Sequence, residues 1–214
     1  MPETRFFKIV RSGVVLVSNF LWSPTIKGLE NLPDKGPFIV APNHRSNIDT
    51  FLIVLTSKKR FRFMGKDSLW KFSLWGKVLS SLGGFPVKRG TVDREALQKS
   101  LKLLAEDEIV VVFPEGERRK GDKIDDIFDG SAFVALKINC PIVPVGIAGS
   151  ELAMPPGSKL PRRKPVALVI GKPILRQEAI GNTTRQKTKN LTSQLQSRLQ
   201  ELLDEATLLL DKKD

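Results

Sequence analysis

Short apolar runs alternate with segments of helical period along most of the chain. The apolar runs are rich in β-branched residues and end at Gly or Pro, as buried strands do. Strands are predicted for residues 38–42, 60–66, 85–90, 108–116, 140–149 and 165–174, and helices for residues 48–57, 68–83, 91–107 and 130–139. This alternation predicts a layered α/β fold in which helices flank a largely parallel central sheet.

The two ends of the chain carry further helical patterns. From Thr184 onward, leucines recur at spacings of three and four, which predicts an amphipathic C-terminal helix packed on the domain. Residues 6–22 also have helical period, but Lys8 and Arg11 interrupt the apolar positions. The uncharged run that follows is shorter than the roughly 20 residues needed to cross a bilayer.

Two interpretations of residues 6–22 stay open at this point. In the first, the apolar side with Phe6, Phe7, Val10, Val14, Val17 and Leu21 packs into the core. In the second, the helix is an interfacial anchor, and Arg5, Lys8 and Arg11 face anionic headgroups.

Length and charge define the broad class. A chain of 214 residues without repeats or a convincing linker predicts one domain. Its 35 Lys and Arg residues against 23 Asp and Glu residues give a net charge of +12. This charge favours an anionic partner, either nucleic acid or the phosphate-rich face of a membrane. The Pro-rich basic segment 154–165 is either a solvated connection or a contact with phosphate or membrane.

Cys140 and His44 are the only residues of their types. A single cysteine permits no internal disulfide, and one His with one Cys excludes the usual His/Cys zinc sites. Cys140 stands among apolar residues, so we expect it to be a buried hydrophobe instead of a reactive thiol.

His44 lies in the segment NHRSNID. Pro42 disfavours a helix through this stretch, and Ser46 or Asn47 is a natural N-cap. The expected arrangement is a strand ending at Pro42, a turn holding His44, and a helix beginning near Ile48. Asp49 then lies in the first helical turn and reaches back to the imidazole.

A histidine oriented by a carboxylate is the base half of a catalytic triad. The sequence contains no G-x-S-x-G nucleophile motif, and Cys140 is a poor nucleophile candidate. His44 would therefore activate a hydroxyl of the substrate. The structural alternative is a histidine that simply satisfies its hydrogen bonds at a helix start.

Two further segments follow predicted strands. VVVFPEGERRKGDK (110–123) places a charged loop at the carboxyl end of a strand, where ligands bind in open α/β sheets. Gly116 would allow close backbone approach, and Arg118 offers a planar fork suited to phosphate. In GGFPVKRG (83–90), Arg89 is either a second phosphate ligand or solvent-facing.

Four segments in this order resemble the lysophospholipid acyltransferases, and the nearest type is the bacterial 1-acyl-sn-glycerol-3-phosphate acyltransferase. They are NHRSNID (43–49), GGFPVKR (83–89), FPEGERR (113–119) and PIVPVGI (141–147). The resemblance implies that His44 is the general base and that Asp49 holds its imidazole. It assigns acceptor binding to Arg89, Glu115, Gly116 and Arg118.

The same resemblance implies the partners and the location. The acyl donor would be acyl-CoA or acyl-carrier protein, the acceptor a lysophospholipid, and no cofactor, metal or nucleic acid is expected. Residues 1–27 would form a membrane-docking helix, and residues 28–214 the α/β acyltransferase domain. The protein would lie on the cytoplasmic face of the cell membrane.

The sequence departs from the family pattern around the expected acceptor pocket. Glu117 and Arg119 replace the common Thr and Ser, and Asp129 stands where Lys is frequent. A different lysolipid or hydroxylated lipid is therefore an alternative acceptor. Two interpretations without acyl transfer also stay open: a non-catalytic basic module that binds nucleic acid or anionic lipid, and hydrolysis of an ester or thioester by water.

Overall fold

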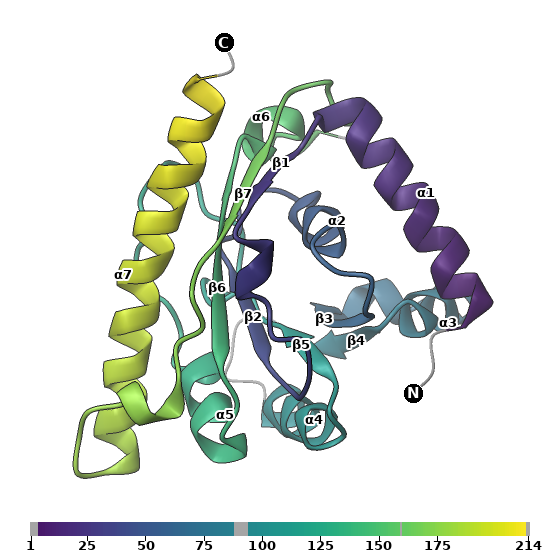
Figure 1. Cartoon of the computed structure of the whole chain (residues 1–214). Helices are drawn as coiled ribbons and strands as arrows, with labels where there is room; N and C mark the ends of the chain where they lie inside the picture. The colour runs from purple at the N-terminus through teal and green to yellow at the C-terminus, as the bar shows by residue number, and fades with distance from the viewer. Residues whose placement is uncertain (1–3, 88–93, 159, 213–214) are drawn as a thin grey trace.

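The computed structural model describes residues 4–87, 94–158 and 160–212 and shows one sheet covered by helices on both faces (Figure 1). In the described chain the sheet has seven strands in the order β1-β7-β6-β2-β5-β3-β4. β6 and β7 are antiparallel, and all other neighbours are parallel. The predicted α/β fold with a largely parallel sheet is therefore confirmed. The strands are β1 Thr25–Lys27, β2 Ile39–Pro42, β3 Phe61–Lys66, β4 Gly84–Val87, β5 Ile109–Val111, β6 Ile142–Ala148 and β7 Ala167–Ile170.

Two hydrophobic layers cover the sheet. α4 (Arg94–Ala105), α5 (Gly130–Ile138) and α7 (Thr184–Asp211) pack on one face. α1 (Arg5–Trp22) and α2 (Asp49–Val54) lie on the other. Successive side chains of β2 alternate between these layers, so that every residue of the strand is buried.

The long C-terminal helix packs directly on β6, as its leucine spacing predicts. Gly146 of β6 is the point of closest approach, because a Cβ atom there would lie 2.3 Å from the backbone of Leu202. The absence of a side chain thus lets α7 seat its leucine face on the sheet. Cys140 is buried in the same layer, as expected, and burial raises the pKa of its thiol to about 11.

The helix predicted for residues 68–83 is divided into two. A 3-10 turn spans Asp67–Trp70, and α3 begins only at Ser73 and ends at Ser81. The chain folds back on itself so that the Trp70 ring fits against Gly65, Gly76 and Gly84. The indole N–H of Trp70 donates a hydrogen bond to Ser80 Oγ (3.0 Å). Tertiary packing of one large ring therefore breaks a continuous helical pattern.

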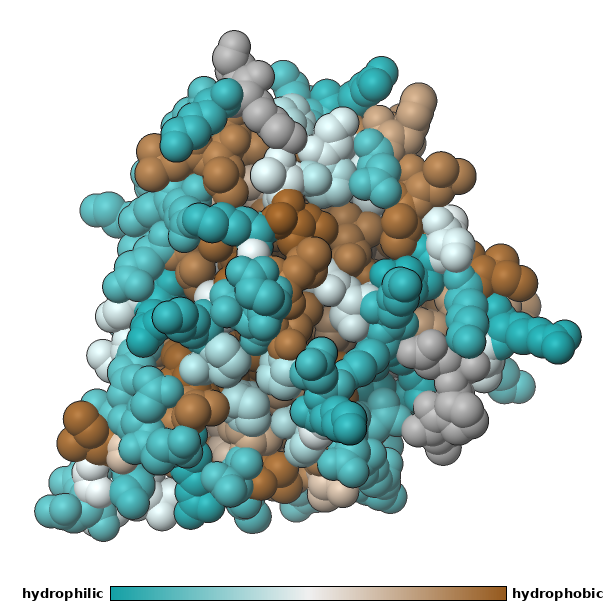
Figure 2. Space-filling model, in the orientation of Figure 1, coloured by the Kyte–Doolittle hydropathy of each residue, from teal (hydrophilic) through white to brown (hydrophobic). Residues whose placement is uncertain are grey.

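α1 is a helix as predicted, but its apolar residues point in two directions. Phe7 and Trp22 are buried, whereas Ile9, Leu16 and Phe20 form an outward stripe with Phe6 and Val17, and Leu16 is 72% exposed. Figure 2 shows hydrophobic side chains along the edge where Figure 1 places α1. Arg11 does not face outward freely, because its Nε donates to the Ser57 carbonyl (2.9 Å).

Two further observations concern this end of the chain. Within the described ranges, no helix combines the length and apolar character that a bilayer crossing requires. Strand β1 pairs with β7, so the sheet of the domain begins before residue 28.

Candidate active site

The candidate site lies in the turn between β2 and α2, at the carboxyl end of a central strand. Asn43 fixes the start of this turn to β6: its Nδ2 donates to the Ile147 carbonyl (3.0 Å), and its Oδ1 accepts from the Ile147 amide (2.7 Å). The chain after Pro42 is therefore held across the sheet by side-chain bonds that mimic a strand pair.

His44 and Asp49 form the predicted contact. His44 Nδ1 lies 2.8 Å from Asp49 Oδ2, and both side chains are almost fully buried. Because the carboxylate accepts a hydrogen bond, the proton of a neutral imidazole resides on Nδ1 and the lone pair on Nε2. The imidazole is therefore arranged as a base whose basic atom points away from the carboxylate.

The turn is closed in a way that the sequence does not predict. Asp49 Oδ2 also accepts the amide N–H groups of Arg45 and Ser46 (2.7 Å each). Ser46 is not the N-cap of α2, since the helix begins at Asp49 after Ile48, which makes no side-chain cap bond. The Ser46 hydroxyl instead donates to the Met154 carbonyl (2.7 Å), in the connection between β6 and β7.

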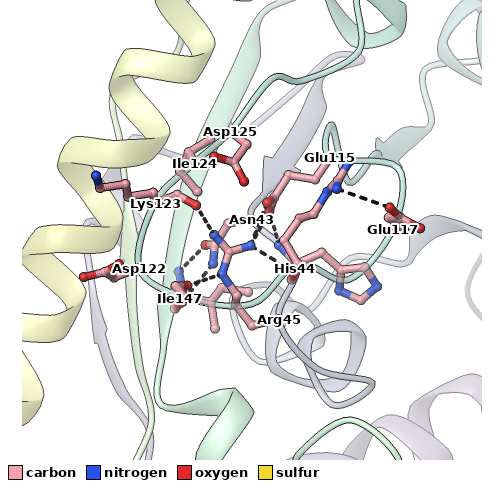
Figure 3. A network of polar contacts seen from close by, with 12 residues as sticks. Asn43, His44, Arg45, Glu115, Glu117, Asp122, Lys123, Ile124, Asp125 and Ile147 are labelled. Carbon is pink, nitrogen blue, oxygen red and sulfur yellow. Dashed lines mark hydrogen bonds and ion pairs between the residues drawn. The ribbon is translucent and has the colours of Figure 1, made fainter.

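A second segment packs against the imidazole. Phe113 follows β5, and its ring stacks on that of His44, with the centroids 4.0 Å apart and the planes at 25°. This contact and the Asp49 bond together fix both the plane and the rotation of the imidazole. In Figure 3 the ring points away from the neighbouring network of charged side chains.

That network centres on Glu115 and Arg45. Both are buried, and Arg45 Nη1 donates to both carboxylate oxygens of Glu115, at 2.9 Å to Oε1 and 2.6 Å to Oε2. Glu115 Oε1 also accepts the His44 amide N–H (2.7 Å). The side chain of Glu115 is only 1% exposed, and the expectation that it binds the acceptor stays a prediction. Its carboxylate is engaged within the protein and holds the backbone of the turn between β2 and α2.

Arg45 connects the turn to the loop that follows β5. Its Nε donates to the Gly121 carbonyl (2.9 Å). Its Nη2 donates to the Lys123 carbonyl (2.8 Å), a contact drawn in Figure 3. The Arg119 amide N–H in turn donates to the His44 carbonyl (2.9 Å). Both backbone polar groups of His44 are thus held by the loop after β5.

The role of Arg45 was not predicted from the sequence. In the segment HRS it reads as an ordinary surface cation, and apart from the adjacent His44 carbonyl its side-chain partners lie more than 65 residues away. The only sequence signal is the acid in FPEG, which directly follows a buried strand and therefore needs a buried partner if it is itself enclosed.

Of the remaining predicted residues, Gly116 and Arg118 lie on the loop that follows β5. Gly116 has a left-handed backbone (φ 72°), and a Cβ atom there would lie 2.6 Å from the Phe128 ring. Arg118 is exposed on the same loop. Arg89 lies outside the described residues.

The two departures from the family pattern form a pair with each other. Arg119 Nη1 lies 3.3 Å from Glu117 Oε1 on the exposed side of the loop. Arg119 therefore neutralises the charge of Glu117, and the pair adds no net charge to the loop after β5. Asp129 is exposed immediately before α5.

Comparisons with known proteins identify a matching family and similar sequences. Residues 23–148 match the family model described as Acyltransferase. The chain is 33% identical over 155 residues to the 1-acyl-sn-glycerol-3-phosphate acyltransferase LPAT1, chloroplastic, of Arabidopsis thaliana, covering 70% of this chain and 43% of that protein. It is 24% identical over 197 residues to the Bacillus subtilis 1-acyl-sn-glycerol-3-phosphate acyltransferase, covering 92% and 96%. The chain thus spans less than half the length of the plant protein.

A solved structure has the same fold. The crystal structure of the 1-acyl-sn-glycerophosphate (LPA) acyltransferase PlsC from Thermotoga maritima superimposes with a TM-score of 0.79 at 24% identity. The match covers 93% of this chain and 78% of that one. The family match includes both the His44 turn and the loop after β5. The chain belongs to the acyltransferase family.

Proposed function

We propose that the protein is a 1-acyl-sn-glycerol-3-phosphate acyltransferase that makes phosphatidate. The observation that carries the proposal is the His44–Asp49 pair, held rigidly at the carboxyl end of a central strand with Nε2 directed away from its carboxylate. The names of its relatives support this acceptor. The donor is an acyl thioester, either acyl-CoA or acyl-carrier protein, and the reaction draws on no cofactor.

The proposed chemistry needs one base that works twice. His44 Nε2 takes the proton of the free glycerol hydroxyl as the oxygen attacks the thioester carbonyl. The tetrahedral intermediate collapses, the C–S bond breaks, and the departing thiolate receives the proton from the imidazolium. Asp49 stabilises the imidazolium in between, so that no acyl-enzyme forms and His44 ends neutral.

We assign acceptor binding to Gly116, Arg118 and Arg89. Gly116 is exposed on the loop after β5, and the exposed Arg118 guanidinium is suited to phosphate oxygens. Glu115 is removed from this set because it acts through the backbone of His44. Glu117 and Arg119 stand where the family commonly has Thr and Ser, so a lysolipid with another headgroup is the second candidate acceptor.

We also propose that α1 docks on the cytoplasmic face of the membrane. Its outward stripe of Ile9, Leu16 and Phe20 is apolar and exposed, while its inner side packs on α2. Because α2 begins at Asp49, a docked α1 would hold the catalytic turn close to the bilayer, where both lipid substrates reside.

Free-thiol release from acyl-CoA by the purified protein in lipid micelles tests the function. We expect release only with lysophosphatidate present, with phosphatidate formed and no turnover by His44→Ala. Release without acceptor would identify a thioesterase. Thiol release with another lysolipid only would identify a different acceptor. No release with any acceptor, from either acyl-CoA or acyl-carrier protein, would reject the proposal.

A further inference from the structure

The connection between β6 and β7 carries an exposed cationic and apolar surface outside the catalytic site. After α6 (Ser150–Ala153) the chain runs through residues 154–165, which we call the basic loop, before β7 begins at Ala167. Leu160 of this loop is 76% exposed, and the consecutive cations Arg162, Arg163 and Lys164 are all exposed. An apolar side chain and three cations thus project from one short segment.

The basic loop is attached to the end of α1. The Arg163 guanidinium carbon lies 5.2 Å from the ring centroid of Phe20, which is itself 66% exposed. Just beyond the loop, the Val166 amide donates to the Trp22 carbonyl (3.1 Å). Figure 1 shows the end of α1 at the top of the molecule, where the chain passes from α6 to β7. The Arg163 side chain therefore continues the apolar stripe of α1, and the neighbouring cations lie within one residue of it in the chain.

The start of the same loop is attached to the catalytic turn. The Ser46 hydroxyl donates to the Met154 carbonyl (2.7 Å), and the Ser46 amide donates to the carboxylate that orients His44. The Arg162 amide closes the loop on α6 by donating to the Ala153 carbonyl (2.6 Å). One loop thus connects the outer face of α1 to the site.

We propose that the basic loop is a second membrane-contact element, which binds anionic lipid headgroups while Leu160 and Phe20 enter the interface. The proposal deepens the proposed docking of α1 and rests on it. Arginine and lysine next to exposed apolar side chains fit the boundary between headgroups and acyl chains. A nucleic acid would satisfy the cations but would leave the apolar stripe uncovered.

Vesicle co-sedimentation tests this inference with the full chain. The probe is phosphatidylcholine vesicles with and without phosphatidylglycerol, and the variant is Arg162→Gln/Arg163→Gln/Lys164→Gln. A matched control, Arg185→Gln/Lys187→Gln/Lys189→Gln, removes the same charge from exposed positions at the start of α7, at the other end of the molecule. Each cation near an anionic surface changes the partition coefficient by roughly fivefold.

We therefore expect the loop variant to bind anionic vesicles roughly 10- to 100-fold more weakly than the wild type, and the control to change by less than about threefold. Wild-type binding by the loop variant, an equal loss in both variants, or binding to DNA but not to vesicles would overturn the proposal.

Turnover of a water-soluble, short-chain lysophosphatidate separates this inference from the proposed function. The loop variant should match the wild type on that substrate, since the catalytic turn is unchanged. A loss of turnover there would show that the loop serves the site itself and would contradict a membrane role. If the wild type is inactive but still binds anionic vesicles, the proposed acyltransferase function is rejected, whereas the proposed membrane contact of the basic loop is retained.

Discussion

Replacing Glu115 distinguishes a positioning role from acceptor binding. Glu115→Ala removes the carboxylate that faces Arg45 and leaves the guanidinium buried without a counter-charge. It also removes the acceptor of the His44 amide N–H. Glu115→Gln keeps an amide oxygen that can still accept a hydrogen bond but loses the charge, so it is the conservative partner of the pair.

The structure sets the size of the effect. Removing one partner of a buried ion pair costs about 3–5 kcal/mol. Arg45 retains three backbone carbonyl partners, those of His44, Gly121 and Lys123, which favours the lower end of that range. We expect Glu115→Ala to lose about 3 kcal/mol of unfolding free energy and Glu115→Gln about 1.5–3 kcal/mol. A domain with roughly 5–15 kcal/mol of stability stays folded after either loss.

Urea denaturation and steady-state kinetics provide the assays. Since Glu115 holds the backbone of His44, we expect kcat to fall by about 100-fold in Glu115→Ala, with KM for lysophosphatidate little changed. The Gln variant should recover part of that loss. Arg118→Gln on the same loop is the matched control, with a raised KM and unchanged stability. A Glu115→Ala protein of wild-type stability, in which only KM is raised, would refute the positioning role.

Three further predictions follow from other contacts. Asp49→Asn should lower kcat by about 10³- to 10⁴-fold in the thiol-release assay, because the imidazolium loses its carboxylate; near-normal turnover would show that Asp49 does not assist His44 in the reaction. Burial raises the pKa of Cys140 from 9.0 to about 11, so its contribution to stability is complete below pH 9 and is lost as the pH rises to about 11. The difference in unfolding free energy between wild type and Cys140→Ala, measured by urea denaturation, should therefore change by about 2–3 kcal/mol across this window, and a constant difference would contradict the burial effect. Gly146→Ala should lose about 1–3 kcal/mol in thermal or urea unfolding, since its Cβ would meet the backbone of Leu202; wild-type stability would show that α7 can shift freely.

The local sequence pattern was sufficient to predict most of the helices and strands and the contact between His44 and Asp49. Strands that are buried on both faces appear in the sequence as continuous apolar runs, and α7 appears as leucines at spacings of three and four. In both cases the buried positions recur with the period of the element. The contact of His44 with Asp49 was predictable for a similar reason. The two residues lie five positions apart, across a turn that Pro42 and the start of a helix define.

Only the tertiary structure decided the rest of the site. Glu115 and Arg45 are 70 residues apart, and each taken alone reads as a solvated charge. Their burial follows from the adjacency of β2 and β5, which brings the loop after one strand onto the turn after the other. The division of residues 67–81 by the Trp70 ring and the outward stripe of α1 were likewise settled by packing. The spacing of apolar residues along a segment determines whether it forms a helix or a strand. Whether a charged or apolar side chain in that segment is buried depends on which other parts of the chain pack against it.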